Sequence, residues 1–332
     1  MPLPSIFQGR LRIPAVGAPM FIVSTPELVL AQCKAGIAGS FPALNARPIK
    51  ALDEWLSRIE DELQAHDRQH PTQRAAPFGV NLIVHRTNDR LEGDTELVIR
   101  HKVPYVITSV GAPHGIVERV HAYGGIVFHD VTNVRHAQKA IATGVDGLIL
   151  VCAGAGGHAG TLSPFALVTE VREFFAGPII LSGAISCGRA IRAAQILGAD
   201  LAYLGTRFIP TIEANATDAY KRMILSSTAA DIVYTPRFSG IPASYLRASI
   251  AAAGHNPDEP GTPPKTIDVV GAESEGDSSA KVWRDIWSAG QGVGTIHTLA
   301  SVAEVVQELT REYEASAIVG NAQYSARPTQ GS

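Results

Sequence analysis

The stretch PIILSGAISCGRAIRAAQILGADLAYLGTRF, residues 178–208, holds two short apolar runs separated by a segment of helix length. The runs PIILS and LAYL lack the alternation of apolar and polar residues that marks a half-exposed strand, so they are typical of strands covered on both faces. A glycine at position 198 is well placed to end the helix between them. The stretch therefore predicts two parallel strands joined by a right-handed helical crossover.

The same alternation of strand and helix extends over the first two thirds of the chain. Eight alternating units close a barrel, whereas an open dinucleotide-binding sheet would carry a G-x-G-x-x-G turn after its first strand, and this turn is absent. We therefore predict the α/β class with a TIM (β/α)8 barrel. The expected strands are 15–18, 38–41, 78–83, 105–109, 125–129, 147–151, 178–182 and 201–204, and the expected barrel helices are 25–34, 49–66, 95–102, 114–123, 134–143, 164–175 and 187–197.

The chain divides into four predicted parts. Residues 1–210 form the barrel, and 211–285 form a smaller, mainly helical and loop region that covers the substrate. Within the second part, 255–280 are rich in proline, glycine and acidic residues, which is typical of a long surface loop or a lid. Residues 286–315 return to the barrel and end in a helix, and 316–332 are expected to form a flexible tail.

Composition excludes several classes of function. The 332 residues include 28 basic and 31 acidic side chains, a net charge of −3, which argues against nucleic acid or an anionic membrane as partner. The start of the chain does not resemble a signal peptide, and its three cysteines do not form a disulfide framework or a CxxC metal pair. We expect a cytoplasmic enzyme that acts on a small molecule. Whether it is a monomer or a homodimer stays open.

The residues that follow each strand are the candidate site residues, because the active site of a parallel barrel forms at the carboxyl ends of its strands. The amide of Asn81 has donors and acceptors that suit the edge of a flat heterocycle. Small residues follow the seventh strand (182–184) and the eighth strand (205–206), where backbone N–H groups could close on a phosphate. These two turns favour a phosphorylated ligand or cofactor.

The loop after the sixth strand brackets His158 with glycines at 154, 156, 157 and 160. Such a loop lets the backbone approach a flat ligand while the imidazole projects toward it as an acid, a base or an anion anchor. The alternative is a glycine-rich turn with an incidental surface histidine. His129, Asp130 and His136 do not form a convincing ligand set, so we predict no metal.

Taken in order, six motifs of the chain resemble those of the nitronate monooxygenase family, formerly called 2-nitropropane dioxygenases. This family also includes FMN-dependent enoyl-acyl-carrier-protein reductases and NADH:quinone reductases. The similarity covers about residues 5–310. The motifs are GAPM (17–20), GVNL (79–82), AGGHAG (155–160), SGAI (182–185), GTRF followed by T-x-E (205–213) and IWSAGQGVG (286–294).

The resemblance implies a TIM barrel with non-covalent FMN and His158 as the catalytic residue. The segment 287–292 would return to cover the flavin, and the turns after the last two strands would hold its phosphate. The implied cofactor-binding residues are Ala18, Pro19, Met20, Asn81, Gly156, Gly157, Ser182, Gly183, Ala184, Leu204, Gly205, Thr206, Gly290 and Gln291.

Three positions depart from the family pattern. Gly154 stands where many members have glutamate, and Val151 where many have glutamine or aspartate. Asp130 stands where the quinone-reductase branch has a lysine. A cation there stabilises the anionic reduced flavin, so an aspartate opposes it and argues against efficient reduction by NAD(P)H.

The resemblance therefore implies oxidation of alkyl nitronates or nitroalkanes by O2 to a carbonyl compound and nitrite. One alternative keeps FMN but uses NAD(P)H to reduce a quinone or an enoyl thioester. Another class of function is a flavin-free barrel isomerase or lyase that grips a substrate phosphate, although the strand ends offer few acid–base residues for it.

Overall fold

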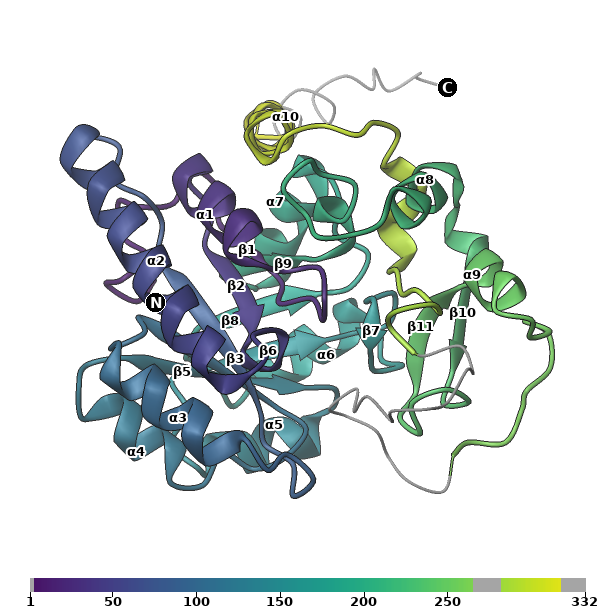
Figure 1. The fold of residues 1–332 in the computed structure, drawn as a ribbon, viewed down its shortest axis with the longest axis horizontal. Helices are drawn as coiled ribbons and strands as arrows, with labels where there is room; N and C mark the ends of the chain where they lie inside the picture. The colour runs from purple at the N-terminus through teal and green to yellow at the C-terminus, as the bar shows by residue number, and fades with distance from the viewer. Residues whose placement is uncertain (1–2, 265–281, 318–332) are drawn as a thin grey trace, which may run out of the picture.

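The computed structural model describes residues 3–264 and 282–317 of the chain, and its centre is an eight-stranded parallel sheet. The strand order is β1-β9-β8-β6-β5-β4-β3-β2. A parallel bridge between Val16 and Ala38, with a 2.7 Å hydrogen bond from the Gly17 N–H to the Ala38 carbonyl, joins β1 to the start of β2. The two ends of the sheet thus meet, and the predicted barrel is confirmed (Figure 1).

All eight predicted strands are present, with ends within two residues of those expected. They are β1 (Ala15–Gly17), β2 (Gly39–Pro42), β3 (Phe78–Ile83), β4 (Tyr105–Ser109), β5 (Ile126–Val131), β6 (Gly147–Val151), β8 (Ile179–Ser182) and β9 (Leu201–Leu204). The helices between them are α1 (Pro26–Ala35), α2 (Ile49–Gln69), α3 (Leu91–Arg100), α4 (Ile116–His121), α5 (Val134–Ile141), α6 (Pro164–Arg172) and α7 (Gly188–Leu197).

Aromatic side chains fill the interior of the barrel. Tyr105 and Phe128 are fully buried and meet nearly edge to face, with ring centroids 6.3 Å apart. Phe7, from the segment before β1, contacts both rings. A Cβ atom at Gly79 would lie 2.2 Å from the Tyr105 ring, so a glycine there gives the ring its space. This packed interior confines any ligand to the ends of the barrel.

The eighth helix of the barrel comes late in the chain. Helix α10 (Val302–Ala315) packs against α7 and α1 and buries Val302, Val305 and Leu309. The Arg207 guanidinium, just after β9, makes an ion pair with Glu308 of this helix. The 97 residues 205–301 therefore lie between β9 and the helix that completes its unit.

The regular structure of the described part of the insertion is mainly helical, as expected, but it also includes two strands that the sequence did not predict. It contains α8 (Asp218–Ser226), α9 (Arg247–Ala252), β10 (Ile232–Thr235), β11 (Ala243–Leu246) and the short helices η3 (Ala229–Asp231) and η4 (Gln291–Thr295). β11 also pairs antiparallel with β7 (Gly157–His158), which lies in the glycine-rich loop after β6. Figure 1 shows β7 between the barrel and the other two strands of this small sheet.

Two further predictions, the long loop and the C-terminal tail, lie only partly within the described residues. Residues 255–264 have no regular structure, as expected for a loop, whereas 265–281 lie outside the described residues. Most of the predicted tail, 318–332, also lies outside them. Across 3–264 and 282–317, no helix is both long and apolar enough to cross a bilayer.

Candidate active site

A cavity of about 750 Å³ opens at the carboxyl ends of the barrel strands, between the barrel and the insertion. Its volume lies in the usual range for a small-molecule or cofactor site. Most of the predicted site residues line it: Ala18, Pro19, Met20, Asn81, Gly156, Gly157, His158, Ser182, Gly183, Ala184, Gly205, Thr206 and Gly290.

Two predicted cofactor residues do not line this cavity. The Leu204 side chain is fully buried in the core, while its carbonyl accepts a 2.9 Å hydrogen bond from the Ala18 N–H. Gln291 is exposed, and its N–H donates to the Gly154 carbonyl over 2.8 Å. Both residues support the wall through their backbones rather than forming it with their side chains.

One wall is backbone packed closely on backbone. A Cβ atom at Gly156 would lie 2.9 Å from the Gly290 nitrogen, and one at Gly290 would lie 2.6 Å from the Gly154 carbonyl oxygen. The Gly290 N–H donates to the Thr206 hydroxyl over 2.9 Å, which ties this return segment to the turn after β9. Larger residues at 156 and 290 would push the two segments apart.

The turn after β8 takes a backbone conformation that few residues adopt. Gly183 has φ 138° and Ala184 has φ 55°. The Ala184 N–H donates to the Gly154 carbonyl, so the turn after β8 and the loop after β6 are held together. A non-glycine residue at positive φ is strained and persists where surrounding structure fixes it, which is common at binding sites.

The turn after β1 is fixed by a side chain that the sequence did not single out. The Asn45 amide donates to the carbonyls of Met20 and Ser24, and its oxygen accepts from the Ile22 N–H. Each of these three hydrogen bonds joins the 20–24 loop to the short helix η1 (Ala43–Asn45). Asn45 thereby fixes the position of Met20 in the wall of the cavity.

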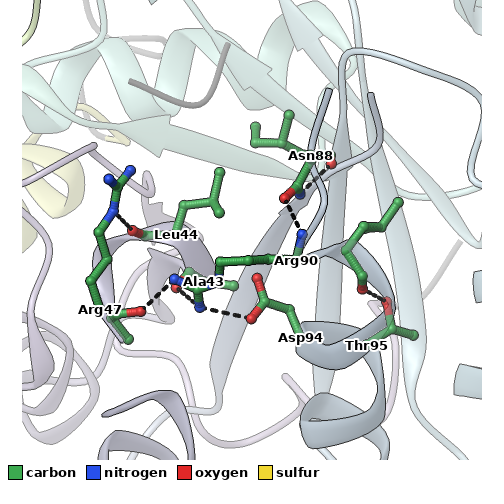
Figure 2. A network of polar contacts seen from close by, with 10 residues as sticks. Ala43, Leu44, Arg47, Asn88, Arg90, Asp94 and Thr95 are labelled. Atoms are coloured by element: carbon green, nitrogen blue, oxygen red, sulfur yellow. Dashed lines mark hydrogen bonds and ion pairs between the residues drawn. The ribbon is translucent and has the colours of Figure 1, made fainter. Parts of the chain in front are cut away.

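The η1 helix is in turn held by α3. The guanidinium of Arg90 donates to the Ala46 carbonyl over 2.7 Å and makes an ion pair with the buried Asp94. Figure 2 shows Arg90 reaching from the start of α3 toward Ala43 and Arg47 while Asp94 lies on its other side. This network supports the loop that carries the lining residues Pro42 and Leu44.

Three polar side chains line one side of the cavity, one from each of β3, β4 and β5. The Asn81 amide donates to the Ser109 hydroxyl over 2.7 Å, and Ser109 donates to Asp130 Oδ2 over 2.6 Å. Burial raises the pKa of Asp130 to about 7, although the Ser109 hydrogen bond acts in the opposite direction. His129, the residue before Asp130, does not line the cavity. Its Nδ1 contacts the Thr108 hydroxyl instead.

His158 is held by the inserted region. It pairs with Ala243 in the small sheet, and its ring meets that of Trp283 edge to face at 5.3 Å. Its Nε2 lies 3.1 Å from the hydroxyl of the buried Ser239. Burial lowers the pKa of His158 to about 4, so the imidazole is neutral at pH 7.

The partners of Ser239 determine which nitrogen of His158 carries the proton. The Ser239 hydroxyl donates its one proton to the Ile241 carbonyl over 2.9 Å, and it accepts from the Tyr245 hydroxyl. A hydroxyl has a single proton to give, so its contact with His158 is satisfied when Nε2–H is the donor. This leaves Nδ1 unprotonated and, among the described residues, without a hydrogen-bond partner.

A family model described as nitronate monooxygenase matches residues 8–312 of the chain. That span includes every strand of the barrel, the small sheet and nearly all of α10. The chain belongs to the nitronate monooxygenase family. It is therefore an oxidoreductase, and the alternative of a flavin-free isomerase or lyase is set aside.

The names of relatives of this nitronate monooxygenase family member refer to more than one activity. The chain is 27% identical to a nitronate monooxygenase of Paraburkholderia phytofirmans, over 91% of this chain and 93% of the relative. It is 30% identical to a (3aS,4S,5R,7aS)-5-hydroxy-7a-methyl-1-oxo-octahydro-1H-indene-4-carboxyl-CoA dehydrogenase of Mycobacterium tuberculosis, over 71% of this chain but 64% of the relative, less than two thirds of its length.

The fold of this family member is also similar to that of a solved structure. A single-residue mutant of FabK from Thermotoga maritima superposes with a TM-score of 0.73 at 26% identity. The match covers 92% of this chain and 94% of that one. The barrel and the inserted region thus both have counterparts within this group of flavin-dependent enzymes.

The cavity of this nitronate monooxygenase family member fits a flavin. Gly156 and Gly290 line it without side chains, so this wall presents backbone, which suits the face of a flat ring. No lysine or arginine of the described ranges lines it, so backbone N–H groups and the hydroxyls of Ser182 and Thr206 are the donors at hand for a phosphate.

The three departures from the family pattern all line this cavity. Gly154 has φ 86°, in the left-handed region that favours glycine, so a glutamate there would be strained. Val151 presents an apolar side chain that is 8% exposed. Asp130 faces the site as well, and its raised pKa weakens the objection that it places a full negative charge beside a flavin.

Sequence reasoning missed several residues of the site. Ser109 follows the carboxyl-end rule as Asn81 does, and reading the end of β4 in the same way would have found it. Ser239 and Trp283 carry no local signal, because long-range contacts bring them to His158: β7 pairs with β11, and Trp283 packs against Tyr245 of β11.

Proposed function

We propose that this chain is an FMN-dependent enzyme that oxidises nitroalkanes and their nitronates with O2 to a carbonyl compound and nitrite. Membership of the nitronate monooxygenase family supports this reaction class. The observation that carries the proposal is the neutral His158 in a cavity with no lining lysine or arginine among the described residues, with Nδ1 free to accept a proton.

The proposed FMN site is the cavity wall described above. The backbones around Gly156 and Gly290 would contact the ring face, and Asn81 its polar edge. The turns at 182–184 and 205–206 would hold the phosphate through N–H groups and hydroxyls. When bound, FMN would supply the acceptor for the substrate electrons and the means to pass them to O2.

His158 would act as the general base. A neutral nitroalkane must lose the proton on the carbon that carries the nitro group, and His158 Nδ1 would take it. Ser239 keeps Nε2–H in place, so the ring presents its basic nitrogen rather than its N–H to the substrate. Trp283 packs against the imidazole and limits its rotation.

A second candidate function is reduction of the flavin by NAD(P)H, followed by transfer to a quinone or enoyl thioester. The electrostatic objection to it assumed an ionised Asp130, but burial raises the pKa of this group to about 7. Two relatives, named as a carboxyl-CoA dehydrogenase and as FabK, keep this candidate open. The two functions differ in which compound reduces the flavin.

The test is a product assay with the protein reconstituted with FMN. We expect O2 consumption and nitrite release from a primary nitroalkane such as 1-nitropropane. The matched control is the same protein without added FMN, from which bound flavin has been removed. A flavin-loaded protein that releases no nitrite from either the nitroalkane or its nitronate would contradict the proposal.

A further inference from the structure

The chain of hydrogen bonds that ends at Asp130 has a fixed direction. The Asn81 Nδ2 group can only donate, and it donates to both the Ile107 carbonyl and the Ser109 hydroxyl. Ser109 must therefore give its own proton to Asp130 Oδ2. The second carboxyl oxygen, Oδ1, is buried and has no hydrogen-bond partner within the described residues.

No lysine or arginine of the described part of the chain lines the cavity around Asp130. The other titratable side chains that line the cavity are two histidines and three tyrosines: His136, His158, Tyr203, Tyr220 and Tyr234. Tyr203 lies close enough for the Asp130 charge to raise its pKa further. A carboxylate with one hydrogen bond and no cation in a buried site favours its neutral form.

We propose that Asp130 is a proton-holding residue of the cofactor site, which binds a proton on Oδ1 when negative charge is placed on a ring in the cavity. This inference rests on the proposed flavin. It assigns to an aspartate the compensation of the charge placed on the ring. A lysine or arginine beside the ring would be a fixed cation, whereas Asp130 compensates by taking up a proton.

A bound flavin that receives two electrons from a reductant would take one proton from solvent and be left with one negative charge. Above about pH 7, where Asp130 is ionised before reduction, it takes a second proton from solvent on Oδ1 and becomes neutral. Two electrons and two protons enter the site, so its net charge does not change. The negative ring raises the pKa of Asp130 above its value of about 7 and makes this uptake favourable.

The experiment is a spectroelectrochemical titration of the FMN-loaded protein at several pH values on both sides of the Asp130 pKa. The slope of midpoint potential against pH gives the number of protons bound per two electrons. For the wild type we expect one proton per two electrons at low pH, where Asp130 is already neutral, rising to two above about pH 7. Asp130→Asn should bind one proton throughout this range.

A second variant moves the transition without removing the carboxyl group. The Ser109 hydrogen bond lowers the pKa of Asp130, so Ser109→Ala should shift the rise from one to two protons to higher pH. An infrared difference spectrum of reduced minus oxidised protein should also show a protonated carboxylic acid band that Asp130→Asn lacks. Far-UV circular dichroism would verify that each variant is folded.

Two failures have different meanings. Equal slopes and equal infrared spectra in wild type and Asp130→Asn, with flavin bound to both, would overturn the inference and leave the proposed function intact. Failure of the wild type to bind FMN at all would contradict the proposed cofactor and the inference together.

Discussion

The Nε2 atom of His158 lies 3.1 Å from the hydroxyl of Ser239, a residue 81 positions later in the chain. The contact joins the loop after β6 to the inserted region, and β7 pairs with β11 beside it. The inserted region therefore does more than cover the barrel. It determines where the imidazole points and which of its nitrogens is free.

Ser239→Ala removes the acceptor for His158 Nε2–H. Because the imidazole then loses the contact that selects its tautomer, we expect kcat for a nitroalkane to fall by about two- to tenfold, the range for one net hydrogen bond. KM should change little, since Ser239 is not among the residues that line the cavity. Steady-state kinetics would measure both constants.

Ser239→Thr is the matched control for this prediction. Threonine keeps the hydroxyl, so it should restore most of the activity that alanine loses. If both variants lose activity equally, or if both retain it fully, the hydroxyl has no role in positioning His158.

The pH profile separates two roles of His158. A base must be unprotonated, so kcat/KM for a neutral nitroalkane should fall as pH drops through about 4 and be level between about 5 and 6. A protonated anchor would give the opposite slope, with activity lost as pH rises through the same value. Recovery of activity after return to neutral pH would show that acid unfolding is not the cause of the fall.

Gly205→Ala tests the proposed phosphate site. A Cβ at Gly205 would meet Ala18 and Met20 at 3.5 Å, an ordinary contact, and φ there is −104°. The protein without flavin should therefore keep its Tm, while the Kd for FMN should rise tenfold or more, about 1.4 kcal/mol, because the methyl group would take space in the cavity lining, in the turn proposed to hold the phosphate.

Gly294→Ala is the control for that variant. A Cβ at Gly294 would make contacts of 3.6 Å or more, and this glycine is outside the cavity lining. It should leave both Tm and FMN affinity unchanged. Equal affinities in the two variants would remove the 205–206 turn from the cofactor site.

Asn45→Ala should destabilise the protein through the 20–24 loop. It removes three hydrogen bonds, each with a net value of about 0.5–1.5 kcal/mol, so we expect the free energy of unfolding to fall by about 2–4 kcal/mol. Denaturant titration would measure it. Asn256→Ala, in an exposed turn, should change the same quantity by less than about 0.5 kcal/mol.

The barrel could be predicted from sequence because its strands are short apolar runs bounded by helices, as PIILS and LAYL show. Both faces of such strands are buried, so the run of apolar residues is unbroken and its first and last residues are easy to place. Asn81, His158 and the turns at 182–184 and 205–206 were predictable from the rule that barrel sites lie at the carboxyl ends of strands.

The small sheet could not be predicted in the same way. β7 has two residues, Gly157 and His158, and two residues carry no periodicity. Its partner β11 lies far along the chain, in the inserted region, and contributes Ala243 by long-range pairing alone. The raised pKa of Asp130 could not be predicted from the sequence either, because it depends on burial and on the Ser109 hydroxyl from the neighbouring strand.

The most direct test of the account is an absorbance spectrum of the FMN-loaded protein without oxygen, recorded after separate additions of 1-nitropropane, NADH and NADPH. We predict that the nitroalkane bleaches the visible flavin band, that both nicotinamides leave it unchanged, and that His158→Asn keeps FMN but slows the bleaching by about 10²- to 10⁴-fold. Rapid bleaching by a nicotinamide with no response to the nitroalkane, or equal rates in wild type and His158→Asn, would contradict it.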